Sequence, residues 1–286
     1  MYPVTSPTFS AHAAAAPGST RAWISGKAAV AALLMMLATA GSAVAASGTI
    51  DLPASGGAKQ RVLYLQPDNP GAALIMFPGG DGSVKLSSDG TFGAGGNFLV
   101  RTRERWVQQG MAVAIPDVPT NRSNLFNYRT SADYAGDVEK IVAYVRTQTK
   151  APIWLVGTSQ GTNAAAGAAS RLTHGEIAGV VLTSTLTRQG NKPNLKETVF
   201  EANLAAINVP VLILSHSGDK CDITPPGDAD RVKAALKSSP KVEVVLVSGG
   251  LPPKSPACEA RAEHGFFGIE PEVVARIAGW IKSNTK

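Results

Sequence analysis

Few residues in this sequence suit metal binding, and its net charge is weak. No group of histidine, cysteine and acidic residues has the spacing of metal ligands, so we expect no metal site. The net charge is +6 for 286 residues, and residues 1–45 carry two basic and no acidic side chains, which leaves +4 for the rest. The basic residues are scattered, and the densest group, Arg101, Arg103 and Arg105, is typical of a solvated helix face. We therefore expect no nucleic-acid partner.

The apolar run near the N-terminus is too short for a comfortable membrane span. This run, Ala28–Ala40, follows two basic residues and precedes the small-residue sequence Ala43-Val44-Ala45. A basic flank, a short apolar core and an Ala-x-Ala site are typical of a secretory signal peptide. We predict a signal peptide over residues 1–45 and a single mature domain over 46–286, periplasmic or secreted and without a stable membrane anchor. An uncleaved anchor is the alternative.

Only two cysteines are present, Cys221 and Cys258, and both lie in the predicted mature part. Exported proteins meet an oxidising compartment, where paired thiols persist as disulfides. We therefore predict a disulfide between these two residues, with two unpaired buried thiols as the alternative. On the chain-entropy model such a cross-link stabilises the folded state by about 3–4 kcal/mol.

Apolar stretches typical of strands alternate with stretches of helical spacing through the mature part. The expected strands are residues 48–52, 61–65, 72–77, 111–115, 152–156, 177–183, 209–214 and 241–247, and the expected helices are 98–109, 132–149, 162–171, 228–237 and 271–282. This alternation predicts an α/β fold with a mainly parallel, doubly wound sheet of about eight strands flanked by helices. Residues 184–206 hold one weak helical stretch, 198–206, so any cap over a site is small.

The pentapeptide Gly157-Thr158-Ser159-Gln160-Gly161 joins an expected strand to an expected helix. It matches the pattern Gly-x-Ser-x-Gly, in which a strained turn exposes the serine hydroxyl at the end of a sheet. Side chains two residues before or after the serine would collide with so tight a turn, which explains both glycines. The alternative is a plain turn rich in glycine and serine, since the pattern also occurs by chance. The first interpretation makes Ser159 a candidate nucleophile.

A serine hydroxyl becomes a good nucleophile only when a neighbouring base takes its proton and a third group orients that base. Of the four histidines, His12 lies in the predicted signal peptide and His174 is expected at the surface. His264 follows the last expected strand, where a loop can reach Ser159, and it is the favoured base. His216 is the less favoured candidate.

The orienting acid is expected after the strand that follows the small cap. Asp219 is in that place and is the favoured acid, with Asp222 as the alternative. Cys221 is two residues from Asp219, and Cys258 is six residues before His264. A disulfide between these cysteines would therefore hold the loop of the acid against the loop of the base.

A glycine-rich segment, Pro78-Gly79-Gly80-Asp81-Gly82, follows the buried strand 72–77. Backbone N–H groups of such a loop can face an open space and stabilise an anion. A plain flexible loop is the alternative interpretation of this segment.

Together, the turn, its context and the order Ser159, Asp219, His264 resemble the α/β-hydrolase-fold serine hydrolases of the exported, bacterial type. The resemblance covers about residues 63–282. It implies an oxyanion hole formed by the N–H groups of Gln160 and of Gly80 or Asp81. The sequence departs from the family pattern in two loops. Pro78-Gly79 stands where the family usually has His-Gly, and Ser217-Gly218 replaces the glycine that the family usually has two to three residues before the acid.

The activity that this resemblance implies is acyl transfer through a seryl intermediate, without cofactor or metal. We favour small-molecule carboxylic esters as substrates, because a small cap and export suit an open site. A peptidase, thioesterase, lactonase or acyltransferase on the same fold remains an alternative. A non-catalytic binding protein on this scaffold is less favoured, since such proteins tend to lose one of the three catalytic residues. The oligomeric state is left open.

Overall fold

Eight strands form the single sheet at the centre of this computed structural model, which describes residues 44–190 and 195–285. The predicted signal peptide lies outside the described residues except for its last two. The strands are β1 (Val44–Pro53), β2 (Lys59–Pro67), β3 (Ala72–Phe77), β4 (Met111–Pro116), β5 (Ile153–Thr158), β6 (Gly179–Thr183), β7 (Val211–His216) and β8 (Val242–Val247). Cleavage after Ala45 would leave β1 starting at Ala46, which pairs with Gln66 of β2.

The strand order is β1-β2-β4-β3-β5-β6-β7-β8, and only β2 runs against its neighbours. All pairs from β4 to β8 are parallel. Every residue of the central strands β3, β4, β5 and β7 is buried, as expected for strands covered on both faces. The predicted mainly parallel sheet of about eight strands is thus confirmed.

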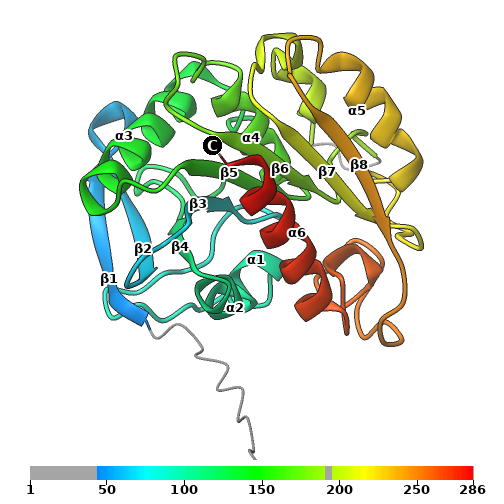
Figure 1. Cartoon of the computed structure of the whole chain (residues 1–286), viewed down its shortest axis with the longest axis horizontal. Helices are drawn as coiled ribbons and strands as arrows, with labels where there is room; N and C mark the ends of the chain where they lie inside the picture. The colour runs from blue at the N-terminus through cyan, green and yellow to red at the C-terminus, as the bar shows by residue number, and fades with distance from the viewer. Residues whose placement is uncertain (1–43, 191–194, 286) are drawn as a thin grey trace, which may run out of the picture. The chain divides into compact units, whose positions relative to one another are not determined.

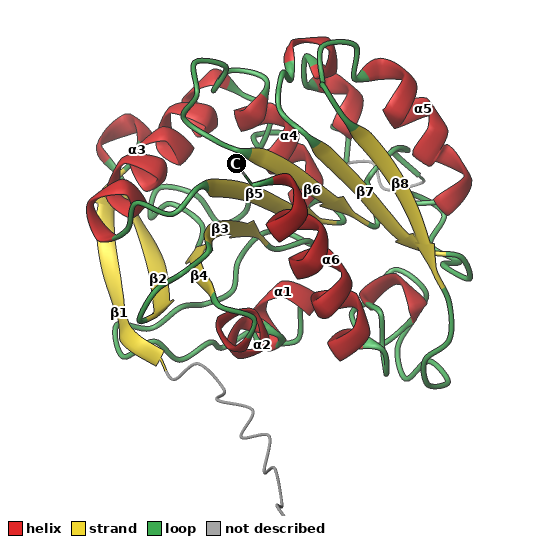
Figure 2. Cartoon of the chain, viewed as in Figure 1, coloured by secondary structure: helices red, strands yellow, loops and turns green. Residues whose placement is uncertain are grey.

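Helices cover both faces of the sheet (Figures 1 and 2). One face packs against α3 (Ala132–Gln148), α4 (Gly161–Ala169) and α5 (Ala229–Ala235). The other face packs against α1 (Phe98–Arg101), α2 (Arg103–Gln108) and α6 (Glu270–Asn284). Two hydrophobic cores result, one on each side of the sheet. None of the helices within the described ranges has the length and apolar character that a membrane span requires.

Two helix predictions differ from the structure in detail. The helix expected over 198–206 is wrong, because this stretch forms two short 3-10 turns, Val199–Glu201 and Leu204–Ala206. Its residues instead pack as a small cover beside α4, with Val199 and Leu204 in the core. The helix expected over 98–109 is interrupted at Thr102, whose hydroxyl donates to the Phe98 carbonyl at 2.7 Å.

Asp228, just before α5, forms hydrogen bonds with the segment that follows β6. Its carboxylate accepts hydrogen bonds from the Thr187 hydroxyl at 2.8 Å and from Arg188 at 2.9 and 3.0 Å. Arg231 donates a further one at 3.2 Å. The hydrogen bonds from Arg188 are the largest cause that holds the pKa of Asp228 below its usual range. The ionised carboxylate is therefore the form that stabilises this junction.

We expect Asp228→Asn to lower the melting temperature at pH 7, by about 2–4 °C for each kcal/mol lost. The contribution of Asp228 is complete above the unfolded pKa of about 3.9 and is lost as pH falls through the lower folded pKa. The difference between wild type and variant should therefore shrink between about pH 4 and the acid-unfolding range. Asp230→Asn, at an exposed position of α5, is the matched control. Thermal unfolding across pH is the measurement, and a difference that does not depend on pH would contradict this role.

Candidate active site

Ser159 occupies a tight turn between β5 and α4, and its backbone has the left-handed φ of +53°. This conformation is costly for a residue other than glycine and is held by the surrounding structure. A Cβ on Gly157 would lie 2.7 Å from Thr162 Cα, and one on Gly161 would lie 2.7 Å from the Phe77 carbonyl carbon. Both positions therefore require glycine, and the strained turn predicted from the motif is confirmed.

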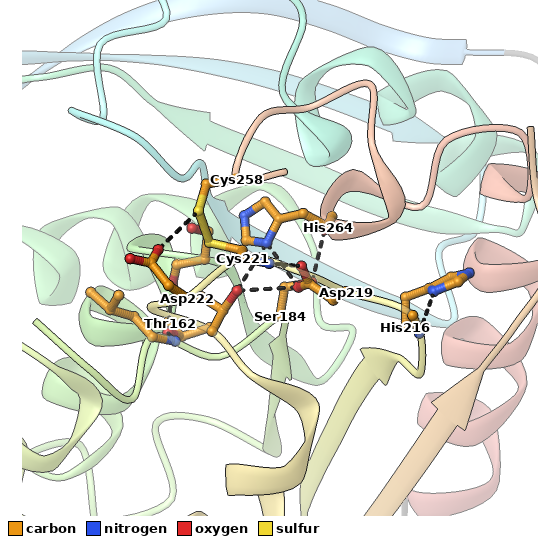
Figure 3. Close-up of polar contacts among 12 residues, drawn as sticks. Thr162, Ser184, His216, Asp219, Cys221, Asp222, Cys258 and His264 are labelled. Carbon is orange, nitrogen blue, oxygen red and sulfur yellow. Dashed lines mark hydrogen bonds and ion pairs between the residues drawn. A yellow bond between two sulfur atoms is a disulfide. The ribbon is translucent and has the colours of Figure 1, made fainter. Parts of the chain in front are cut away.

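His264 and Asp219 form a buried pair. His264 Nδ1 lies 3.0 Å from Asp219 Oδ2, and the side chains of the two residues are 6% and 0% exposed (Figure 3). Thr224 completes the cluster, because its hydroxyl donates to Asp219 Oδ2 at 3.1 Å and lies 3.0 Å from His264 Nδ1. The other carboxylate oxygen, Oδ1, accepts the N–H of Cys221 at 2.9 Å. Both oxygens of the acid are thus held in place.

The hydrogen bonds of this cluster determine the tautomer of neutral His264. A carboxylate only accepts, and the Thr224 hydroxyl already gives its proton to Asp219, so Nδ1 must carry the ring proton. Nε2 then has a free lone pair. The backbone of His264 is fixed as well, since the Ser184 hydroxyl donates to its carbonyl at 2.8 Å. Both the ring and the backbone of His264 are therefore held in place.

The alternative acid and bases lie elsewhere. Asp222 is exposed and is not bonded to His264. His216 lies away from the pair in Figure 3, and its ring bridges the Gly218 N–H and the Gly249 carbonyl at 3.0 and 2.9 Å. His174 is exposed on a loop, as expected. The structure thus pairs His264 with Asp219.

The predicted disulfide between Cys221 and Cys258 is present, with the two Cα atoms 4.6 Å apart. It joins the loop of Asp219 to the segment that leads to His264, so the expected covalent tie is confirmed. Asp222 lies close to both sulfur atoms, within 4.8 Å. Sulfurs in a disulfide are not thiolates, so this trio is not a metal site.

Ser159 and His264 line one cavity of about 250 Å³. Its walls come from the glycine-rich loop, the start of α1, the turn before α4 and the segment before α6: Gly79, Gly80, Gly96, Asn97, Phe98, Thr158, Ser159, Gln160, Ile223, Cys258, Glu259, Ala260, His264 and Gly265. Of the residues predicted for the site, Ser159, His264, Gly80, Gln160 and Cys258 are among them. Asp81, Asp219, Cys221 and Asp222 are not.

The loop after β3 packs directly against the serine. A Cβ on Gly79 would lie 2.9 Å from Ser159 Cβ, so only glycine allows this approach. Gly80 has a φ of +62°. Within residues 44–190 and 195–285, the N–H groups of Gly80 and Gln160 have no hydrogen-bond partner. Unpaired backbone N–H groups of this kind can bind an anion.

The prediction of a solvated helix face is wrong for Arg101, whose side chain bonds to other segments of the chain. Its guanidinium donates to the carbonyls of Gly265 and Gly96 at 2.6 and 2.9 Å and forms an ion pair with Glu270 at 2.9 Å. Burial lowers its pKa, and the bond to Glu270 opposes that shift. Since Gly96 and Gly265 both line the cavity, Arg101 holds two of its walls together.

No sequence pattern points to Thr224 or to the contacts of Arg101. Thr224 carries no motif, and only its position five residues after Asp219 connects it to the acid loop. The contacts of Arg101 are made with residues up to 169 positions away. No local pattern signals such contacts.

Removing the disulfide with Cys221→Ser and Cys258→Ser together should lower the free energy of unfolding by about 3–4 kcal/mol. The physical reason is the larger conformational freedom of the unfolded chain once the cross-link is gone. Denaturant unfolding measures the loss. A thiol reductant should destabilise the wild type to the same degree and leave the double variant unchanged. An equal effect of the reductant on both proteins would contradict the assignment.

The fold is similar to those of known hydrolases, although no protein-family model and no curated protein sequence matches the chain. The Pyrococcus furiosus esterase Pf2001 has a TM-score of 0.59 at 15% identity, covering 84% of this chain and 94% of that one. A soluble variant of Saccharomyces cerevisiae monoglyceride lipase gives 0.58 at 12%, covering 86% and 97%. Porphyromonas gingivalis dipeptidyl peptidase 4 gives 0.57 at 12%, covering 85% and 36%. The chain has the α/β-hydrolase fold.

Proposed function

We propose that this protein is a serine hydrolase that cleaves carboxylic esters through an acyl-enzyme. One observation carries the proposal: His264, which is paired with the buried Asp219, lines the same cavity as Ser159 in its strained turn. A nucleophile, an oriented base and backbone donors are the parts that acyl transfer requires. The catalytic residues we assign are Ser159, His264 and Asp219.

In the proposed reaction, Ser159 Oγ attacks the ester carbonyl while His264 Nε2 takes its proton. Asp219 holds the Nδ1–H and stabilises the imidazolium that forms. The carbonyl oxygen becomes an oxyanion, which accepts hydrogen bonds from the N–H groups of Gly80 and Gln160, each worth about 3 kcal/mol. His264 then gives the proton to the leaving alkoxide. Water, deprotonated by the same histidine, releases the carboxylic acid and restores the serine.

The cavity supports small substrates. Its volume of about 250 Å³ is below the roughly 300–1,000 Å³ of most ligand pockets. The apolar side chains among its lining are few, chiefly Phe98, Ile223 and Ala260. We therefore assign short acyl groups to this site. The similar structures are those of an esterase, a lipase and a peptidase, so the fold by itself does not indicate which acyl substrate is used.

Export is part of this proposal, with residues 1–45 as the signal peptide and 46–286 as the mature domain. The Cys221–Cys258 disulfide supports it, because such bonds persist in the periplasm or outside the cell. Nucleic acid is not among the proposed partners, and neither a metal nor a cofactor enters the proposed reaction.

Hydrolysis of p-nitrophenyl esters of increasing chain length by the mature protein tests the proposal. We expect turnover of the acetate and butyrate, a steep decline for long chains, and loss of activity in Ser159→Ala. Ser170→Ala, at the other end of α4, is the control and should keep wild-type rates. No turnover by a folded wild-type protein would overturn the ester assignment. It would favour a peptide or polymer substrate, or a non-catalytic role.

The choice of acid is tested by two matched substitutions. Asp219→Asn should reduce kcat by about 10⁴-fold, because the amide no longer selects the Nδ1–H tautomer of His264. Asp222→Asn, three residues away and exposed, should leave kcat within about threefold of wild type. Steady-state kinetics with the acetate ester measure both. The reverse pattern would assign the acid to Asp222.

A further inference from the structure

A buried arginine lies directly behind the glycine-rich loop. Arg129 is 1% exposed, and its Nη2 donates to the Gly80 carbonyl at 2.8 Å. Its Nη1 donates to the Leu125 carbonyl at 3.3 Å. The same segment is tied to the loop a second time, because the Leu125 N–H donates to the Asp81 carbonyl at 2.8 Å. Neither the resemblance nor the sequence pattern assigns a role to this residue.

The positive charge of Arg129 is not neutralised by an ion pair. Among the described residues no carboxylate forms a salt bridge with it, and its Nε has no hydrogen-bond partner. Burial lowers the pKa of its guanidinium, while Tyr134, Glu197 and Asp81 act in the opposite direction. An arginine keeps its charge even so. Burying an unpaired charge costs folding free energy. We therefore expect Arg129 to have a function that offsets this cost.

The space around Arg129 is shaped for this contact. Gly82 has a φ of +88°, which favours glycine, and a Cβ there would lie 2.9 Å from Arg129 Nη2 and 2.7 Å from Leu125 Cδ1. On the other side, a Cβ on Gly167 of α4 would lie 2.9 Å from the Arg129 carbonyl oxygen. The arginine is thus enclosed between the loop after β3 and the helix that follows Ser159.

Two hydrogen bonds, one on each side, restrict the orientation of Gly80. The Gly79 carbonyl accepts the Gly82 N–H at 3.3 Å, and the Gly80 carbonyl accepts Arg129. Both peptide planes that flank Gly80 are therefore fixed. In a trans peptide the N–H points opposite to the carbonyl, so the Gly80 N–H is directed away from the Gly79 carbonyl and out of the turn. Gly80 also lines the cavity that holds Ser159.

We propose that Arg129 is a positioning residue for the oxyanion hole. Its guanidinium holds the Gly80–Asp81 peptide, which restricts rotation about Gly80 and so helps to keep the Gly80 N–H, on the adjoining Gly79–Gly80 peptide, in one orientation for the anion. Its uncompensated charge lies behind the same loop. Preorganised donors act mainly on the transition state, where the negative charge develops. This inference rests on the proposed function, since it concerns the same Ser159 site.

A purely structural role makes a different prediction. An arginine that only joined two loops would lower stability and the active fraction when replaced, without changing how the remaining active protein binds a transition-state analogue. The inhibition constant of a reversible boronic acid separates the two roles, because it does not depend on the fraction of folded protein. Such an inhibitor becomes tetrahedral when its boron accepts the serine oxygen.

The experiment measures kcat, KM and the boronic-acid inhibition constant for Arg129→Met and Arg129→Lys. We expect Arg129→Met to lower kcat and to raise the inhibition constant of phenylboronic acid, each by about 10–100-fold. KM should stay within threefold of wild type. Arg129→Lys, which keeps the charge and loses the planar fork, should lie between Arg129→Met and wild type. Arg122→Met is the matched control, since Arg122 is exposed on the same segment and stacks on Tyr128 at 3.4 Å. It should change none of the three values.

Unchanged boronate inhibition in both Arg129 variants would overturn the inference. If neither variant folds, nitrogen NMR of the wild-type protein tests the inference instead. The side-chain resonances of Arg129 must shift when phenylboronic acid binds, those of Arg122 must not, and static Arg129 resonances would overturn the inference. Failure of the proposed function is distinguishable, because then the wild type neither hydrolyses esters nor binds the boronate.

Discussion

The close approach of three backbone segments around Ser159 is the constraint on which the rest of the site depends. The end of β3, the end of β5 and the start of α4 come so near one another that Gly79, Gly157 and Gly161 have no room for a Cβ. This contact forces the serine into its left-handed conformation. It also brings the loop after β3, with the Gly80 N–H, beside Ser159. The same close packing therefore positions both the Ser159 turn and the loop that contains Gly80.

The opposite wall of the site is held by covalent and polar ties. The Cys221–Cys258 disulfide joins the acid loop to the segment before His264, and Thr224 bridges the carboxylate and the imidazole. Arg101 connects the His264 segment to the glycine-rich side of the cavity. Asp219, Thr224 and both cysteines lie on irregular segments, so these ties replace the rigidity that a helix or strand would supply there. The geometry is preorganised from both sides.

The two arginines act through backbone carbonyls. Arg101 and Arg129 each donate to a carbonyl of a glycine that lines the cavity, Gly265 in one case and Gly80 in the other. Glycine loops allow close approach to a ligand but are flexible by themselves. A buried guanidinium with several fixed donors restrains such a loop without occupying the space in front of it. The cavity is thus lined by glycine loops, and arginine side chains behind these loops restrain them.

By itself the sequence determined the features that arise from local patterns. Apolar runs bounded by turns predicted the strands, the spacing of Gly157, Ser159 and Gly161 predicted the strained turn, and the order of acid and base followed from their places after strands. Only the tertiary structure shows that His264 pairs with Asp219, that Thr224 bridges them, and that Arg101 and Arg129 bond the loops around the cavity. The physical reason is distance along the chain: these hydrogen bonds join residues 40, 45, 49 and 164 positions apart. Such pairings depend on how the sheet brings loops together, and no local pattern records them.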